Sequence, residues 1–276
     1  MQPKKSLGQN FLQDKEVLNK IIRSADLKSD DNIIEIGPGQ GALSAKLKKE
    51  SGKLIMIEKD RFLAEEMARN FKFPILNFQS ISNYPTLKFK KKSVVIIGDI
   101  LKINLPELIE KNNFKKYKVV ANIPYYITSP IIQLFLETKF PPQEMFLMIQ
   151  KEVAERICAT PGQMSILSIS VQYYAEPEII FYVDKKSFYP IPEVDSAVIH
   201  ITHNMGHKTK KEAEDFFRVV RAGFSAKRKM LANNLANSLH LDKKEVIKKL
   251  SEIKIAPNQR AQELSVEDWK KISNLF

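Results

Sequence analysis

Short apolar segments alternate with stretches of helical periodicity over the first 150 residues. Each apolar segment has the length of a strand and is apolar at consecutive positions, which is typical of strands buried on both faces of a sheet. These segments span 32–37, 53–58, 93–99, 118–122 and 145–150. Between them, apolar residues recur at helical spacing in 41–50, 61–71 and 129–140. Strands that alternate with helices predict βαβ units and a parallel sheet, so the expected fold class is α/β.

The pattern changes twice in the second half of the chain. Residues 165–183 and 194–203 read as strands without long helices between them, and we expect an antiparallel pair at the sheet edge. From residue 204 a polar linker leads into segments with helical periodicity only. The sequence therefore predicts an α/β domain over 1–203 and a small all-helical domain over 204–276.

Composition and charge narrow the class of protein. No apolar run is long enough for a membrane span and no signal peptide is apparent, so a cytoplasmic protein is expected. Cys158 is the single cysteine, which excludes a disulfide framework. His200, His203 and His207 lack acidic or cysteine partners in ligand register, so no metal site is expected. The net charge of +12 favours a polyanionic partner, although a generally lysine-rich surface gives the same number.

A glycine-rich turn joins the first strand to its helix in the segment EIGPGQGALS, residues 35–44. Glycines at 37, 39 and 41 allow a sharp turn and the close approach of a ligand, and the helix start beyond them offers free N–H groups. Gly37, Gly39 and Ala42 also satisfy the dinucleotide fingerprint, so the turn by itself indicates only a nucleotide-like ligand. A plain loop is the alternative interpretation.

Polar residues end the next three strands. Glu58 can accept hydrogen bonds from both ribose hydroxyls of an adenosine, although its surroundings, EKDR, are also typical of a surface carboxylate. Asp99 suits the exocyclic amine of an adenine, and a dinucleotide site has no such third acid. Asn122 ends the fourth strand. Because the carboxyl ends of parallel strands share one edge of the sheet, we expect these groups to meet there.

The set of motifs resembles a known family. It is similar to the KsgA-type ribosomal RNA adenine dimethyltransferases almost end to end, including the helical domain. The motifs that carry the resemblance are GQNFL (8–12), EIGPGQGAL (35–43), IEKD (57–60), GDIL (98–101), NIPYYIT (122–128), QKEVAERI (150–157), FYPIPEVDSAV (188–198) and VVRAGFSAKRKMLANNL (219–235).

The resemblance implies a Rossmann-like class I methyltransferase domain that binds S-adenosylmethionine and a C-terminal helical domain that binds RNA. The expected reaction dimethylates two adjacent adenosines near the 3′ end of small-subunit (16S) ribosomal RNA, within an assembling ribosomal particle. A monomer is the default expectation. One departure is the segment 70–92, which makes the interval between Glu58 and Asp99 longer than the family pattern.

Carried over by position, the resemblance assigns cofactor contacts. Asn10 and Leu12 would close over the cofactor from the N-terminal arm, and the turn at Gly37 and Gly39 would face its methionine part. Glu58 would hold the ribose and Asp99 the adenine amine. Asn122 would contact both cofactor and substrate.

The segment Asn122-Ile123-Pro124-Tyr125 would carry the chemistry. On its own this segment could simply be a turn that ends the strand. An adenine amine is a poor nucleophile, and acceptors such as the Asn122 side-chain carbonyl and the backbone carbonyls before Tyr125 favour the charge that develops on its nitrogen. Pro124 fixes the backbone, Tyr125 would stack on the extruded base, and Phe188 would stack on its other face. Tyr126 is expected to pack rather than react.

Basic residues gather in the segment RVVRAGFSAKRK of the helical domain. Arg221, Lys227, Arg228 and Lys229 are expected to contact RNA phosphates, with a solvated helix face as the alternative.

Three other functions compete with this one. A DNA adenine methyltransferase uses similar motifs, but Ile123 and the GQNFL arm argue against it. A non-catalytic nucleic-acid-binding factor on the same fold would not need the intact acids and Asn122. An oxidoreductase is the weakest alternative, since its dinucleotide site does not use a third acid.

Overall fold

The computed structural model describes the chain except for residues 1–2, 5–6, 78–92, 115, 205 and 207–208. The chain divides into two compact units, Met1–Ala154 with Pro177–His203, and Glu155–Glu176 with Asn204–Phe276. The second unit's long segment begins at Asn204, where the sequence predicts the helical domain to start. The segment Glu155–Glu176 was predicted to lie in the α/β domain but belongs to the second unit. Its residues Met164, Ile169 and Tyr173 are buried in the hydrophobic core of that unit.

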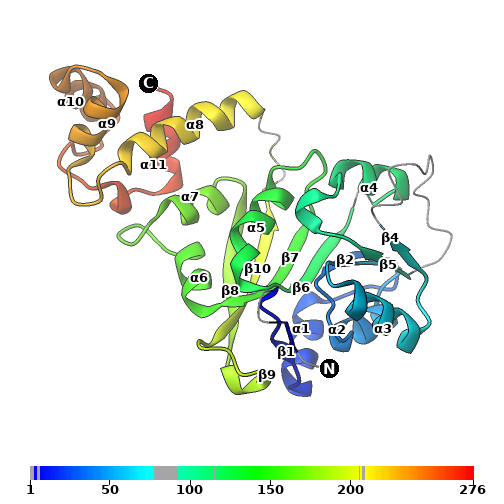
Figure 1. Cartoon of the computed structure of the whole chain (residues 1–276). Helices are drawn as coiled ribbons and strands as arrows, with labels where there is room; N and C mark the ends of the chain where they lie inside the picture. The colour runs from blue at the N-terminus through cyan, green and yellow to red at the C-terminus, as the bar shows by residue number, and fades with distance from the viewer. Residues whose placement is uncertain (1–2, 5–6, 78–92, 115, 205, 207–208) are drawn as a thin grey trace. The chain divides into compact units, whose positions relative to one another are not determined.

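The first unit is built on a mixed sheet in which the described strands follow the order β4-β5-β3-β2-β6-β7-β10-β8 (Figure 1). The strands from β4 to β7 are parallel, and β10 runs antiparallel to β7. Their bounds are β2 Asn32–Ile36, β3 Lys53–Glu58, β4 Ile75–Asn77, β5 Ser93–Ile97, β6 Lys118–Asn122, β7 Glu144–Gln150, β8 Ala175–Val183 and β10 Ser196–His203. The α/β prediction and its five strands are confirmed, while β4 lies in the long segment for which no strand was predicted.

Helices flank this sheet in Figure 1, with α1, α2 and α3 on one side and α4 and α5 on the other. Leu18, Leu47 and Met67 from the first three helices share one hydrophobic core with Val120 and Met148 of the strands. The bounds are α1 Lys15–Ala25, α2 Ala42–Glu50, α3 Arg61–Phe71, α4 Leu105–Asn112, α5 Thr128–Leu136 and α6 Lys151–Ile157, with 3-10 turns η3 Ile100–Lys102, η4 Tyr125–Ile127 and η5 Lys185–Ser187. A separate two-stranded ladder pairs β1, Phe11–Leu12, with β9, Phe188–Tyr189.

The strand predicted to start at residue 165 is wrong over its first half, because Ile166–Gln172 forms helix α7. Alternating Ser and apolar residues imitate a strand there. Ser165 and Ser168 form a reciprocal capping box, which satisfies free N–H groups at a helix start. The side-chain amide of Gln172 then donates to the backbone carbonyls of Ile157 and Ala159 over 2.9 and 2.8 Å. Local hydrogen bonding therefore outweighs the strand-like pattern.

The second unit is helical from residue 209 onward. Its helices are α8 Lys210–Gly223, α9 Leu231–Leu239, α10 Lys243–Glu252 and α11 Val266–Ser273, with a 3-10 turn η6 Ala261–Glu263. Trp269 lies fully buried at their centre, and Gly223 packs so closely on it that an added Cβ would lie 2.2 Å from the indole ring. This core is separate from the core of the first unit.

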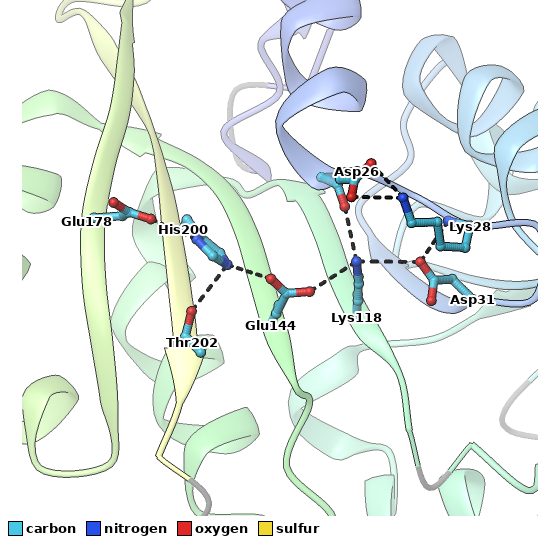
Figure 2. Close-up of polar contacts among 9 residues, drawn as sticks. Asp26, Lys28, Asp31, Lys118, Glu144, Glu178, His200 and Thr202 are labelled. Carbon is cyan, nitrogen blue, oxygen red and sulfur yellow. Dashed lines mark hydrogen bonds and ion pairs between the residues drawn. The ribbon is translucent and has the colours of Figure 1, made fainter.

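An ion-pair network ties the amino-terminal ends of the central strands together (Figure 2). Lys118, at the start of β6, lies 3.0 Å from a carboxylate oxygen of Glu144 and 3.5 Å from one of Asp31. The ring nitrogens of His200 each lie 2.9 Å from a carboxylate oxygen, one of Glu144 and one of Glu178. His200 is thus part of a structural network at the edge opposite the strands' carboxyl ends.

Candidate active site

A pocket lies along the carboxyl edge of the parallel strands. The loops after β2, β3, β5 and β6 line it together with the N-terminal arm, a name we use for the described part of residues 3–12. Nine of the residues predicted from the sequence line this one pocket: Asn10, Leu12, Gly37, Gly39, Glu58, Asp99, Asn122, Pro124 and Tyr125. The structure therefore brings together all the predicted cofactor residues and most of the predicted catalytic ones.

The turn after β2 depends on two glycines. Gly37 and Gly39 have φ angles of +62° and +58°, in the left-handed region that residues with a Cβ rarely adopt. The Gly37 N–H donates to the carbonyl of Ile57 over 2.9 Å, which ties the turn to β3. A Cβ on Gly39 would lie 3.2 Å from the ring of Phe11. Backbone conformation and close packing of the arm both require glycine here.

Glu58 is a buried carboxyl group held by two backbone donors. Its side chain accepts from the N–H of Gly39 over 3.1 Å and from the N–H of Asp60 over 2.8 Å. Burial raises the pKa of Glu58, and these two hydrogen bonds act in the opposite direction. The contacts fix the carboxyl group between the glycine turn and the loop after β3.

Asp99 lies on the neighbouring strand end and is partly exposed to the pocket. One carboxylate oxygen accepts from the N–H of Leu101 over 3.1 Å, and the other lies 3.0 Å from Nζ of Lys59. Partial burial raises the pKa of Asp99, but the hydrogen bonds from Lys59 and Leu101 outweigh it and hold the pKa below its ordinary value. The pocket thus presents an ionised acceptor at this edge.

The segment after β6 begins with a fixed amide. The side-chain nitrogen of Asn122 donates to the backbone carbonyl of Asn10 over 3.3 Å. The Ile123 N–H donates to the carbonyl of Met148 over 3.1 Å, which extends the pairing with β7. This bond to the arm uses one of the two amide hydrogens and orients the side chain, whose carbonyl oxygen can accept from a ligand.

Two tyrosines follow Pro124 on the turn η4. The hydroxyl of Tyr125 lies 2.8 Å from Oγ of Ser196, and burial raises the pKa of this phenol. Tyr126, expected to pack rather than react, is 53% exposed and also lines the pocket. Its ring comes so close to Gly8 of the arm that a Cβ there would lie 3.3 Å away.

The N-terminal arm is held to the pocket by Asp60. This carboxylate has only 4% of its side chain exposed and lies 2.9 Å from Nζ of Lys4. It also accepts from the side-chain amide nitrogen of Gln9 over 3.0 Å. The side-chain oxygen of the same Gln9 accepts from the Lys4 backbone N–H over 2.7 Å. Two arm residues therefore converge on one buried charge, a contact that the sequence reasoning missed.

Glu35 is a second residue that the sequence reasoning missed. It stands in the otherwise apolar strand β2, is 1% exposed and lines the pocket. Burial raises the pKa of Glu35 to about 8, and its Oε2 atom has no hydrogen-bond partner. The sequence did contain a signal for Glu35: an ionisable residue stands inside a strand predicted to be buried on both faces. Such a residue needs a partner or a ligand.

Comparison with known proteins decides the family. The family model described as "Ribosomal RNA adenine dimethylase" matches residues 1–276. A "Ribosomal RNA small subunit methyltransferase A" from Dehalococcoides mccartyi is 41% identical over 273 residues, 99% of this chain and 88% of that protein. One from Fusobacterium nucleatum is 40% identical over 277 residues, 99% of this chain and 97% of that protein. The chain belongs to the ribosomal RNA adenine dimethylase family.

Solved structures agree with this assignment. A dimethyladenosine transferase from Plasmodium falciparum is 26% identical with a TM-score of 0.75, and the match covers 95% of each chain. The 23S rRNA methyltransferase ErmE is 22% identical with a TM-score of 0.71 over 96% of this chain and 99% of that one, which shows the shared fold. The dimethylase is therefore an S-adenosylmethionine-dependent methyltransferase of the class I fold with C-terminal helices, as its sequence predicts.

The pocket of the dimethylase fits this cofactor chemically. An adenosine offers ribose hydroxyls and an exocyclic amine, which are hydrogen-bond donors, and Glu58 and Asp99 offer acceptors within the same pocket. The positive-φ turn at Gly37 lets a ligand approach the backbone. The unpartnered oxygen of Glu35 gives a further hydrogen-bonding group.

One predicted catalytic residue lies elsewhere in the dimethylase. Phe188 is 3% exposed, belongs to the hydrophobic core and is not among the residues that line the pocket. Its backbone pairs with Leu12 in the β1–β9 ladder, which directs the ring into the core beside Leu12. Phe188 therefore does not line this pocket, and its stacking on a substrate base stays a prediction.

The predicted RNA-binding residues of the dimethylase lie on the second unit. Arg221 is on α8, and Lys227, Arg228 and Lys229 are in the loop before α9, all exposed. The buried amide of Asn234 donates to the carbonyls at residues 223 and 226 over 2.6 and 3.0 Å, which fixes the start of this loop. The hydrogen bonds from Asn234 thus hold the backbone at the start of the loop that carries Lys227, Arg228 and Lys229.

Two further sequence expectations concern metals and membranes. Among the described residues no group of His, Cys, Asp or Glu has the arrangement of a metal site, and His207 lies outside the described residues. No described helix has the length and hydrophobicity needed to cross a bilayer.

Proposed function

We propose that this enzyme transfers two methyl groups to the exocyclic amine of each of two adjacent adenosines near the 3′ end of small-subunit ribosomal RNA. The observation that carries the proposal is the pocket in which Glu58 and Asp99, acceptors suited to an adenosine, lie beside the segment Asn122–Tyr125, which suits a target amine. The names of the relatives support the small-subunit substrate.

The cofactor supplies an electrophilic methyl group on a sulfonium, which leaves a neutral thioether. On the side of the chain, Glu58 would accept from the ribose hydroxyls and Asp99 from the adenine amine. The backbone at Gly37 and Gly39 would border the methionine part. Asn10 and Leu12 would cover it from the arm.

Asn122 would act on the substrate amine through its carbonyl oxygen. The amine loses conjugation with the ring as its nitrogen becomes positively charged, and an acceptor placed at its hydrogens favours that change. The hydrogen bond from the Asn122 nitrogen to the carbonyl of Asn10 over 3.3 Å supports the orientation that this role needs. The backbone carbonyl of Ile123 or of Pro124 would accept the second amine hydrogen.

Tyr125 would stack on the target base once it leaves the RNA helix. Base–aromatic stacking contributes about 1–3 kcal/mol per base and tolerates small changes of geometry. The contact between its hydroxyl and Oγ of Ser196 over 2.8 Å supports this role, because it holds the ring in place before the base arrives. Such preorganisation aligns the amine with the methyl group, which lowers the entropic part of the barrier.

Arg221, Lys227, Arg228 and Lys229 would bind phosphates of the ribosomal RNA. An enzyme of ribosome assembly acts in the cytoplasm, which is where we place it. We also propose a monomer, the default state for a chain of this kind.

The test offers the purified protein radiolabelled S-adenosylmethionine with three substrates: small subunits that lack the modification, the naked ribosomal RNA and duplex DNA. Dimethyladenosine at two neighbouring positions of the RNA is the expected product. Methylation of DNA alone would replace the proposal with a DNA methyltransferase. Tight binding of subunits without methyl transfer would indicate a non-catalytic assembly factor.

A further inference from the structure

Lys59 forms an ion pair with Asp99 in the cofactor pocket. It directly follows Glu58 at the end of β3 and lines the pocket. Its ammonium lies 3.0 Å from Oδ2 of Asp99, which follows the neighbouring strand β5. The parallel register brings the two together, since Glu58 pairs with Ile97 and the Gly98 N–H donates to the Glu58 carbonyl over 2.8 Å. The pairing of β3 with β5 therefore places the Lys59 ammonium beside Asp99, the acid proposed to bind adenine.

The contact with Lys59 leaves Asp99 able to accept further hydrogen bonds. Oδ1 of Asp99 accepts from the N–H of Leu101 over 3.1 Å, and Oδ2 faces Lys59. A carboxylate has about four lone-pair directions on its two oxygens, so each oxygen keeps one for another donor. With both oxygens anchored, the side chain has one preferred orientation, and 19% of it remains exposed.

We propose that Lys59 is a positioning residue for the cofactor's base: it holds the Asp99 carboxylate as an oriented acceptor, so that the pocket selects a purine with an exocyclic amine over one with an oxo group there. This inference rests on the proposed role of Asp99 in binding adenine. An amine donates to a carboxylate, whereas an oxo group would place two acceptors against each other.

The charge state of Asp99 supports this role of Lys59. Burial raises the pKa of Asp99, whereas the hydrogen bonds from Lys59 and Leu101 and the charge of Lys59 lower it, with a net decrease. Without Lys59 the effect of burial remains, the hydrogen bond and the charge of Lys59 are both lost, and only Leu101 and the charge of Lys102 still lower the pKa of Asp99. A protonated Asp99 could donate to an oxo group, so the pocket discriminates between the two purines where Asp99 is ionised, and Lys59 favours that state.

The experiment compares binding of S-adenosylhomocysteine and S-inosylhomocysteine by calorimetry to the full-length wild type, Lys59→Met and Lys59→Arg. The wild type should prefer the adenosyl compound by about tenfold or more, the range for a hydrogen bond to a charged group. Lys59→Met should lose most of that preference through weaker binding of the adenosyl compound. Lys59→Arg, which keeps a cation beside Asp99, should recover it.

A pH series separates positioning from general damage. For Lys59→Met, the loss of adenosyl binding on acidification should begin at a higher pH than for the wild type, because Asp99 then takes up its proton earlier. Lys28→Met is the matched control, since Lys28 also pairs with an aspartate, Asp26, over 2.9 Å and lies outside the pocket lining. It should match the wild type in both measurements.

Two outcomes would overturn the inference in distinguishable ways. If Lys59→Met keeps the wild-type preference and pH profile while the wild type binds the adenosyl compound, Lys59 is only a solvated ion pair and the proposed function stands. If the wild type fails to bind either compound, the proposed cofactor site fails and the inference fails with it.

Discussion

Glu35 places an ionisable group where the sheet is otherwise apolar. Burial raises its pKa to about 8 in the folded protein, against an ordinary value of 4.5. Folding therefore takes up a proton between these two values, and the free energy of unfolding falls as pH rises from about 4.5 to about 8.

Glu35→Gln should remove this pH dependence, because an amide of the same shape does not ionise. Urea unfolding of the wild type and the variant at pH 5 and pH 9 is the measurement. The wild-type midpoint should fall more between the two pH values than that of the variant. Equal falls would mean that water reaches the carboxyl group and that it ionises freely.

Asn122 belongs to the same pocket but should affect the reaction rather than stability. Asn122→Ala should reduce the turnover number by about a hundredfold or more, in the range measured for the loss of one group that stabilises developing charge. Affinity for the ribosomal substrate should change little, because phosphate contacts supply most of it. Single-turnover methylation and filter binding measure the two quantities. Near-normal turnover would exclude the proposed role.

At the scale of elements, both backbone pairing and side-chain contacts attach the N-terminal arm. The β1–β9 ladder pairs Phe11 and Leu12 with backbone partners, whereas Lys4 and Gln9 reach Asp60 through side chains alone. Burial raises the pKa of Asp60, but the hydrogen bonds from Lys4 and Gln9 outweigh it, so this carboxylate stays charged and favours the closed arm.

Lys4→Met should therefore let the arm open more often. We expect S-adenosylhomocysteine to dissociate about two- to fivefold faster, the range for a partly exposed ion pair, and to associate no more slowly. Stopped-flow fluorescence gives both rates, and Lys15→Met, an exposed lysine on α1, is the control. Slower association with unchanged dissociation would show that Lys4 attracts the ligand instead of fastening the arm.

The elements show what sequence alone can and cannot provide. Strand ends that carry Gly37, Glu58, Asp99 and Asn122 are predictable, because parallel strands must bring their carboxyl ends to one edge. Asp60 and its partners are not, since they meet across more than fifty residues and depend on how the arm folds.

Side-chain direction is the other quantity that the pattern leaves open. Phe188 starts a segment that matches the family motif, yet its direction depends on pairing with β1, which no periodicity reveals. Tyr126 was expected to pack rather than react, and the 3-10 turn leaves it half exposed with its ring close to Gly8 of the arm. The sequence pattern also failed to predict backbone structure at helix α7. The capping box of Ser165 and Ser168 favours a helix where the pattern predicted a strand.

For the whole molecule, the excess of positive charge raises the question of which cations bind RNA. Replacing Lys227, Arg228 and Lys229 together by alanine should weaken binding to the ribosomal particle and reduce its salt dependence. The log–log slope should fall by up to roughly 0.7–0.9 per lost phosphate contact. Affinity for S-adenosylhomocysteine should not change, because these residues do not line the pocket.

The control for this variant changes net charge by the same amount in the same unit. Lys243, Lys244 and Lys248 are exposed on α10, and their triple alanine variant should keep more of the salt dependence. Equal slopes for both variants would mean that net charge, and not the loop before α9, attracts the RNA. If neither variant changes the salt slope, Lys227, Arg228 and Lys229 form only a solvated surface.

The separate cores of the two units have a consequence for thermal melting. Every residue that lines the pocket belongs to the first unit, so a bound nucleoside stabilises that unit directly, by about 2.7 kcal/mol at a ligand concentration of 100 Kd. Calorimetric scans with S-adenosylhomocysteine should therefore shift one transition upward and leave the other in place. A single peak that moves as a whole would instead show that the units melt cooperatively, so that tight cofactor binding would also protect the helices of the second unit from heat.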